Sequence, residues 1–233
     1  MTSKVFPKPI QQIISRRPIS FTAGSINGIR ELRKTQTRRV MYPQPTGGCP
    51  VQDPARPLQW IDEGGKNWRC PYGIAGDLLS VREVWARVEP SPTSIPEEYG
   101  LPVAWRVEKN PKILGYWRKR VIFYADFPGK KPEECGRWAT DNKWRSPLTM
   151  PRWATRLWLK VVHIRIERLQ MITAKDIMAE GVEVGCVTSD FTDKLTPAFQ
   201  RTWNVINGEK NPWASNPWVW CIAFEWQKVE SKA

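Results

Sequence analysis

The sequence predicts an α+β domain: a small mixed β-barrel with two or three short helices and long loop insertions. Segments of alternating apolar residues are separated by Gly- and Pro-rich stretches, helical periodicity is confined to short runs, and strands and helices do not alternate regularly. A chain of 233 residues suits one domain with insertions, or two small domains. We expect residues 1–17 to form a basic N-terminal arm and residues 18–233 to form a single domain.

The first elements of the domain follow the arm directly. A short strand is predicted over 18–22, where two apolar residues alternate with polar ones. Ser25 is a candidate N-cap for a helix over 26–34. The chain is then predicted to be extended over 35–40, because Thr favours strands.

Insertions interrupt the middle of the chain at residues 42–75, 86–118 and 127–154. They have little periodicity, and loops of this length in a compact domain are uncommon unless they are functional or disordered. Between them, apolar runs predict strands over 78–85 and 120–125, and a shorter strand is expected near 103–107.

The C-terminal part carries the strongest patterns. Residues 155–168 alternate along their whole length and predict the longest strand. The alternation places these residues on one face: Leu157, Leu159, Val161, His163, Arg165 and Glu167. A helix is predicted from the cap Thr173 to Gly181, and a second helix over 197–206. Residues 218–226 are apolar on both faces until their end, which predicts a buried strand.

The positive charge of the chain is concentrated in two segments. Lys and Arg number 36 against 23 Asp and Glu, a formal net charge of +13. Residues 1–40 hold nine basic and one acidic residue, and residues 112–160 hold twelve and four, so each segment has an excess of +8. A localised excess favours binding to a polyanion, and nucleic acid is the expected partner. Unspecific positive charge is the alternative interpretation.

Tryptophan is unusually frequent, with 14 residues, and several lie next to cations. Indole rings stack on bases while neighbouring cations contact phosphates. We therefore predict nucleic-acid contacts at Arg118, Lys119, Arg120, Arg145 and Arg152, and a substrate contact at Trp153. Core packing is the alternative role for many of these tryptophans.

The segment Leu32-Arg33-Lys34-Thr35-Gln36-Thr37-Arg38-Arg39 resembles the G-x-K-x-x-T-x-R signature of the ASCH domain family. This family belongs to the PUA-like superfamily of small β-barrels, which are associated with RNA and modified nucleosides. Lys34, Thr37 and Arg39 match the signature. Leu32 stands where the family has Gly, so we do not expect the helix to end in the usual left-handed glycine cap.

Further stretches strengthen the resemblance, in the family's order. Gly76-Asp77 resembles the turn into a barrel strand, residues 169–180 resemble the strand-to-helix segment that ends in an acid, and the C-terminal strand resembles the closing strand. The wider set of motifs is most similar to the enlarged ASCH-type proteins of phages and prophages: Cys70-Pro71-Tyr72-Gly73, Met150-Pro151-Arg152-Trp153-Ala154 and Asn216-Pro217-Trp218-Val219-Trp220.

Within this family, the chain is similar to small N4-acetylcytidine amidohydrolases at Lys34, Thr37 and Glu180. The resemblance implies that these three residues form the active site. Amide hydrolysis needs a nucleophile, a base and a proton donor for the leaving amine. Thr37 would be the nucleophile, Lys34 the base and Glu180 the proton shuttle or orienting carboxylate, with nearby arginines and burial lowering the pKa of Lys34. Arg38 and Arg39 are expected to bind substrate.

Other functions stay open at this point. The chain is alternatively a non-catalytic RNA-binding module whose basic residues contact phosphates, a ribonuclease, or a phage protein that binds a host factor. Such a module would bind with a strong salt dependence, because neutralised phosphates release counterions.

No cofactor or metal is expected. The sequence has no P-loop or dinucleotide-binding glycine motif, and its five cysteines, which include no C-x-x-C pair, are irregularly spaced. No run of eighteen apolar residues and no secretory signal is found, so no membrane span is expected. A reduced, cytoplasmic compartment is the expected location.

Overall fold

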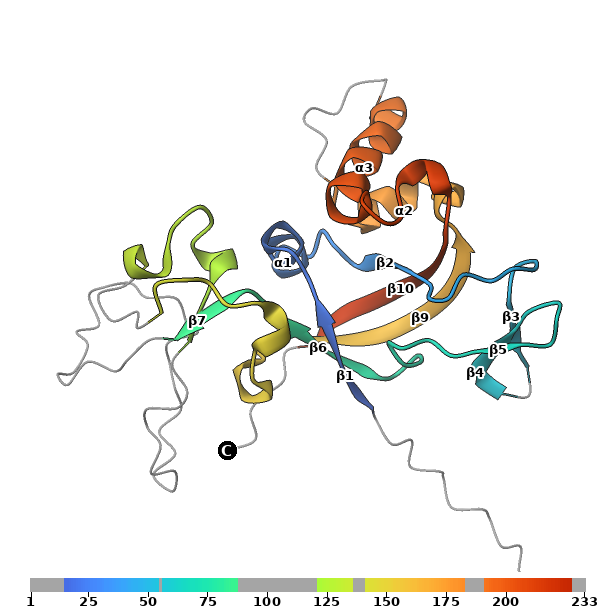
Figure 1. Cartoon of the computed structure of the whole chain (residues 1–233), viewed down its shortest axis with the longest axis horizontal. Coiled ribbons are helices and arrows are strands. Elements are labelled where there is room, and N and C mark those ends of the chain that lie inside the picture. The colour runs from blue at the N-terminus through green and yellow to red at the C-terminus, as the bar shows by residue number, and fades with distance from the viewer. Residues whose placement is uncertain (1–14, 55, 88–120, 136–140, 183–190, 228–233) are drawn as a thin grey trace, which may run out of the picture.

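The computed structural model describes residues 15–54, 56–87, 121–135, 141–182 and 191–227 (Figure 1). These residues form an α+β structure with three α-helices, which confirms the predicted class, although the last helix, with 17 residues, is longer than predicted. The strands are β1 (Arg16–Ser20), β2 (Gln36–Val40), β3 (Val51–Asp53), β4 (Arg56–Ile61), β5 (Asn67–Trp68), β6 (Leu78–Arg82), β7 (Trp85–Arg87), β8 (Val121–Phe123), β9 (Trp158–Arg168) and β10 (Trp218–Gln227). The α-helices are α1 (Ala23–Arg30), α2 (Ala174–Ala179) and α3 (Phe191–Asn207).

A five-stranded sheet with the order β1-β6-β9-β10-β2 forms the centre of the molecule. Only β1 and β6 pair in parallel within it. The sheet is strongly curved (Figure 1), and β1 and β2 are its two edges. Among the described strands these edges do not pair, so the sheet curls like a barrel that hydrogen bonds do not close.

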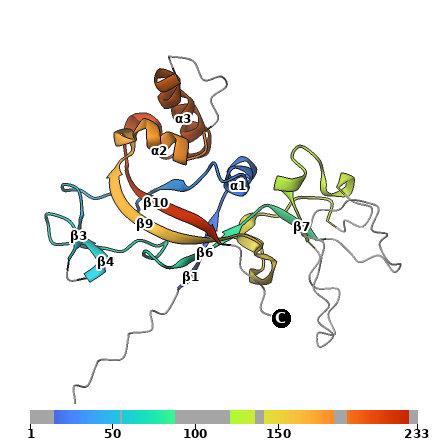
Figure 2. The same cartoon turned by 180° about the vertical axis from the view of Figure 1, so that it is seen from behind.

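The two faces of this sheet are buried against different partners. The inner face carries a large apolar cluster that includes Leu159, Val161, Trp220 and Ile222. The outer face packs against α2 and α3 through a second cluster that includes Leu195, Phe199, Trp203 and Cys221. Both views show α2 and α3 together on one side of the sheet (Figures 1 and 2). The buried C-terminal strand is confirmed, because β10 contributes to both clusters.

A β-bulge in β9 overturns the single alternation predicted for residues 155–168. Val161 pairs with Phe224 and His163 with Ala223, so Val162 is the extra residue. An extra residue reverses which side chains face the core beyond it. Leu159 and Val161 are buried before the bulge, and Ile164 and Ile166 after it. Arg165 and Glu167 therefore face the helices and not the apolar core.

The segment 42–75, predicted as a loop, contains a three-stranded sheet of β3, β4 and β5. Its strands are too short to show periodicity, and tryptophans fix it in place. Trp60 pairs with Trp68 across the strands and meets Trp220 of the main sheet edge to face, with ring centroids 5.0 Å apart. The segment 127–154 is loop-like where it is described, with short 3-10 turns at Pro132–Glu134, Pro147–Thr149 and Arg152–Ala154.

Several element boundaries differ from the prediction. Helix α3 begins at Phe191, six residues before Pro197, which lies inside the helix. Because proline has no backbone N–H, one helical hydrogen bond is missing at this interior position. The strand predicted over 78–85 divides into β6 and β7 at Glu83 and Val84. Strand β1 begins at Arg16, within the predicted arm, whereas residues 1–14 and the strand expected near 103–107 lie outside the described residues. Within the described part, no helix is long and apolar enough to cross a membrane.

Candidate functional site

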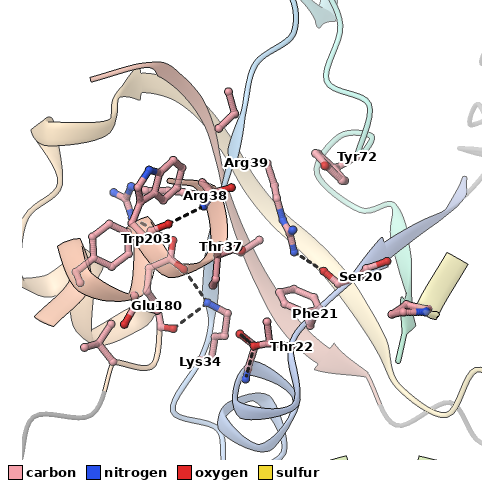
Figure 3. A pocket seen from close by; sticks show the side chains of 18 of the residues that line it. Ser20, Phe21, Thr22, Lys34, Thr37, Arg38, Arg39, Tyr72, Glu180 and Trp203 are labelled. Carbon is pink, nitrogen blue, oxygen red and sulfur yellow. Dashed lines mark hydrogen bonds and ion pairs between the residues drawn. The ribbon is translucent and has the colours of Figure 1, made fainter. Parts of the chain in front are cut away.

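An open cavity of about 570 Å³ lies beside the edge strand β2. The end of β1 and the start of α1 line one side, α3 lines another, and the end of α2 supplies Glu180 (Figure 3). The cavity thus occupies the region where the two sheet edges, β1 and β2, fail to meet. Its volume suits a ligand of nucleotide size.

Lys34 and Glu180 form a buried ion pair at the cavity. Lys34 Nζ lies 2.7 Å from Glu180 Oε2 and donates a hydrogen bond of 2.8 Å to the Glu180 carbonyl. The exposed fractions of the two side chains are 6% and 7%. The backbones of the same residues form an antiparallel bridge. Two contacts of Lys34 therefore hold the end of α2 against the start of β2.

The turn before Lys34 ends helix α1 with a left-handed residue, which contradicts the expectation drawn from the missing glycine. Leu32 has a φ of 60°. The Leu32 N–H donates to the Ile29 carbonyl and the Arg33 N–H to the Gly28 carbonyl, the two bonds of a Schellman cap. Leu32 is largely exposed, so its side chain meets no steric obstacle from the core. The cap geometry that aims Lys34 therefore forms without glycine.

Thr37 and Arg39 project from β2 toward the inner side of the sheet, opposite Ile222 and Trp220. Thr37 lies between Lys34 and Arg39 in Figure 3. The Thr37 side chain is buried at the cavity wall, and no hydrogen bond engages its hydroxyl within the described part of the chain. Arg39 Nη2 donates to the Ser20 carbonyl over 2.6 Å and so connects the two edges of the sheet.

Arg38 projects to the other side of β2, where three carboxylates hold it. Its Nη1 lies 3.3 Å from Glu180 Oε1, and its Nη2 lies 2.5 Å from Glu167 Oε1 and 3.2 Å from Asp176 Oδ2. Only 1% of the Arg38 side chain is exposed. Arg38 therefore positions Glu180 and has little freedom to bind substrate.

A second arginine closes this arrangement into a ring of charges. Arg165 Nε lies 2.9 Å from Glu167 Oε2, and its Nη2 lies 2.8 Å from Asp176 Oδ1. We call the cycle Arg38–Glu167–Arg165–Asp176 the charge ring. Its two cations and two anions neutralise each other, and Glu180 links it to Lys34.

The ring sets the protonation of its own members. Burial opposes the charge of Asp176, but hydrogen bonds from Thr173 and Arg165 and the positive charge of Arg38 hold its pKa well below the ordinary value. Burial also disfavours the charged form of Glu167. Arg165, Cys221 and Arg38 nevertheless lower the pKa of Glu167 below its ordinary value. Burial alone would lower the pKa of Arg38, yet Cys221, Glu180 and Glu167 raise it. These groups therefore stay charged at neutral pH.

The other residues predicted as site residues lie away from this cluster. Trp153, about half exposed on a 3-10 turn, is not among the residues that line the cavity. Arg152 beside it is exposed. Arg145 makes two hydrogen bonds of 2.6 Å to Asp141 and lies over the Trp85 ring, so its charge is already engaged. Arg118, Lys119 and Arg120 lie outside the described residues.

Sequence reasoning missed the aromatic lining of the cavity and three of the four residues of the charge ring, Glu167, Arg165 and Asp176. Phe21, Tyr72 and Trp203 line the cavity (Figure 3), and of these only Tyr72 lies in a motif of the resemblance, Cys70-Pro71-Tyr72-Gly73. Asp176 forms a capping box with Thr173 at the start of α2. A carboxylate three residues after a helix cap was the available signal for a charge near Glu180. Within the described residues, no group of three or more His, Cys, Asp or Glu side chains is arranged to hold a metal ion.

Comparisons of this chain with protein-family models, with curated proteins and with solved structures found no match. The site is therefore interpreted from its own geometry.

Proposed function

We propose that this chain is an ASCH-type, PUA-like protein that recognises RNA or a modified nucleoside in the cavity, and that it hydrolyses an N4-acylated cytidine amide there. One observation carries the proposal: Lys34, Thr37 and Glu180, which are up to 146 positions apart in the chain, line one cavity, and two of them form a buried pair. The aromatic residues Phe21 and Tyr72 beside them suit a planar base.

The arrangement supplies each group that amide hydrolysis requires. Thr37 Oγ attacks the acyl carbonyl carbon, the amide C–N bond breaks, and the exocyclic nitrogen leaves as the amine. A proton first moves from Lys34 to Glu180 across their 2.7 Å contact, which lets Lys34 take the proton of Thr37. Glu180 then gives its proton to the leaving nitrogen. Water hydrolyses the Thr37 ester, releases the carboxylic acid and restores the hydroxyl.

The test is incubation of the purified protein with N4-acetylcytidine and, separately, with a labelled RNA oligomer, each followed by mass spectrometry. We expect cytidine and acetate from the nucleoside, and no cleavage of the RNA. Lys34→Ala, Thr37→Ala and Glu180→Gln are each expected to reduce turnover at least a hundredfold, since proton transfer by a positioned group contributes about 10²–10⁴ in rate. Thr37→Ser keeps a hydroxyl and should retain measurable turnover.

Lys160→Ala is the matched control, because Lys160 is an exposed lysine on β9 outside the cavity. It should behave as the unaltered protein. Unchanged turnover in Lys34→Ala would show that the catalytic assignment is wrong. Shortened RNA would instead support a ribonuclease.

A non-catalytic nucleic-acid-binding module is a second candidate. The observation in its favour is that Lys34 also donates to the Glu180 main chain, a contact that serves to join α2 to β2 whether or not chemistry follows. This candidate predicts intact nucleoside in the same assay, together with salt-dependent retention of the intact RNA in a gel-shift experiment.

A further inference from the structure

The positively charged side chains that line the cavity differ in how many carboxylates they contact. Three cations line it, Lys34, Arg38 and Arg39, with Glu180 as the acidic residue among the lining residues. Glu180 binds both Lys34 and Arg38, and the charge ring provides Arg38 with two further carboxylates. Lys34 and Arg38 are thus neutralised by carboxylates that they contact.

Arg39 has no such partner among the described residues. No carboxylate lies within 4.0 Å of its guanidinium there, and its neighbours are the Ser20 carbonyl and the Phe21 ring, whose centroid lies 5.0 Å from Arg39 Cζ. Its Nε is buried without a hydrogen-bond partner, and the Arg39 side chain lines the cavity. Burial lowers the pKa of Arg39, and Tyr72 and Glu180 oppose this shift only in part. A bound anion would supply the missing counter-charge.

Helix α1 adds positive potential at the same place. Its cap Thr22 and its third residue Ser25 line the cavity, and Figure 3 shows Thr22 beside Phe21. The Thr22 hydroxyl accepts a hydrogen bond from the Ser25 N–H, and the N-terminal end of the helix carries a partial positive charge. No acidic residue occupies this first turn. A helix N-terminus beside an arginine without a counter-ion is a favourable place for phosphate.

We infer that Arg39 and the first turn of α1 bind a phosphate group of the ligand, so that the cavity takes nucleotides in preference to neutral nucleosides. This inference rests on the proposed nucleoside-binding role of the cavity. Thr37 and Arg39 lie on one face of β2, two residues and about 6.6 Å apart along the strand. Both side chains line the cavity, so one nucleotide would place its acyl group at Thr37 and its phosphate at Arg39. The phosphate belongs either to a free mononucleotide or to the backbone of an RNA.

The test is isothermal titration of the full chain with cytidine, cytidine 5′-monophosphate and the dinucleotide cytidylyl-cytidine, with inorganic phosphate as competitor. The monophosphate should bind at least about tenfold more tightly than cytidine, as expected for hydrogen bonds to a charged group. Inorganic phosphate should displace the monophosphate. Dinucleotide affinity equal to that of the monophosphate would assign the subsite to an RNA backbone, and weaker dinucleotide binding would assign it to a free nucleotide.

Two substitutions at one position connect the preference to Arg39. Arg39→Gln should abolish the difference in affinity between cytidine monophosphate and cytidine, and Arg39→Lys should retain part of the difference. Lys160→Gln removes an exposed positive charge outside the cavity and should leave the preference intact. Thermal unfolding of each variant establishes that it is folded.

The outcomes separate this inference from the proposed reaction. Equal affinity for cytidine and its monophosphate in the unaltered protein, or a preference that survives Arg39→Gln, would overturn the phosphate subsite. An Arg39-dependent preference without any hydrolysis of N4-acetylcytidine would support the subsite and contradict the proposed reaction. Failure of all the probes to bind would contradict both.

Discussion

Gly181 lies where the backbone of α2 comes closest to Lys34. It has a φ of 76°, and a Cβ atom at this position would lie 2.8 Å from Lys34 Cβ. Residues other than glycine adopt this left-handed conformation at a cost of about 1–2 kcal/mol. The glycine therefore serves two purposes, the left-handed end of α2 and the space for the Lys34 side chain.

Gly181→Ala is expected to combine backbone strain with displacement of Lys34. Gly65 has nearly the same φ, 77°, but nothing lies within 4 Å of its Cβ position, so Gly65→Ala is a matched control for the strain alone. We expect a loss in the free energy of unfolding of about 1–2 kcal/mol for Gly65→Ala, and a further loss of about 1–3 kcal/mol for Gly181→Ala from the steric overlap. Urea unfolding measures both. Equal losses would mean that Lys34 moves aside freely.

Leu32 also has a strained left-handed backbone conformation, and its side chain is exposed. Its φ is 60° and its exposed fraction is 65%. Leu32→Gly is therefore expected to raise the free energy of unfolding by up to about 1 kcal/mol. Glycine relieves the left-handed strain, and this gain is partly offset because glycine makes the unfolded chain more flexible. Leu32→Val, which adds a β-branch at the same φ, should lower it. Denaturant midpoints at constant slope would measure both changes.

At the scale of elements, the charge ring depends on the bulge in β9. Val162 shifts the register so that Arg165 and Glu167 face α2 and meet Arg38 from β2 and Asp176 from the helix. Four charges from three elements are thus held at fixed distances behind Glu180. Through Arg38 this network positions Glu180, which lines the cavity.

Arg38→Gln should unfold at markedly lower denaturant concentration, because it leaves Glu167, Asp176 and Glu180 without their shared cation. Removing one partner of a buried ion pair costs about 3–5 kcal/mol. Arg145→Gln removes one arginine from a pair at the surface with Asp141 and should cost about 1 kcal/mol or less. Arg38→Lys should lie between the two, since one ammonium cannot reach three carboxylates. Comparable losses at positions 38 and 145 would contradict the role of the ring.

The ring also gives the molecule an acid-sensitive element. The pKa values of Glu167 and Asp176 are lower in the folded protein than in the unfolded chain, so the unfolded chain binds more protons as the pH falls. Their contribution to stability is complete above the unfolded values and is lost progressively below about pH 5. Asp176→Asn should flatten the acid limb of a plot of unfolding free energy against pH between 5 and 3. An unaltered limb would show that other carboxylates cause it.

At the scale of the whole molecule, some of the positive charges are paired with carboxylates and others are not. The arginines of the charge ring and Arg145 are engaged by carboxylates, which leaves polyanion binding to other parts of the basic surface. The net charge of +13 remains after all such pairs are counted. Binding to RNA is therefore expected to depend on residues away from the cavity.

Replacing Arg118, Lys119 and Arg120 together by Ala should weaken RNA binding and reduce its salt dependence. Each lost phosphate contact lowers the slope of log affinity against log salt by about 0.7 for a single strand, so three lost contacts lower it by about 2. The control replaces the exposed Lys160, Lys175 and Lys194, which removes equal charge elsewhere. Fluorescence anisotropy at several salt concentrations measures the slopes. An equal change in both triple variants would indicate unspecific attraction and no interface at 118–120.

The sequence by itself determined the local features of this protein: the α+β class, the long strand β9, the buried strand β10 and the capped helix that ends at Gly181. These follow from periodicity and caps, which short stretches of chain encode. It also identified Lys34, Thr37, Arg39 and Glu180 as candidate site residues, because they match the motifs of the resemblance. Only the tertiary structure decided that Arg38 faces a ring of carboxylates while Arg39 faces the cavity without one. The reason is physical: a single bulge reverses which side chains face the core, and the compensation of a charge depends on neighbours that are distant in sequence.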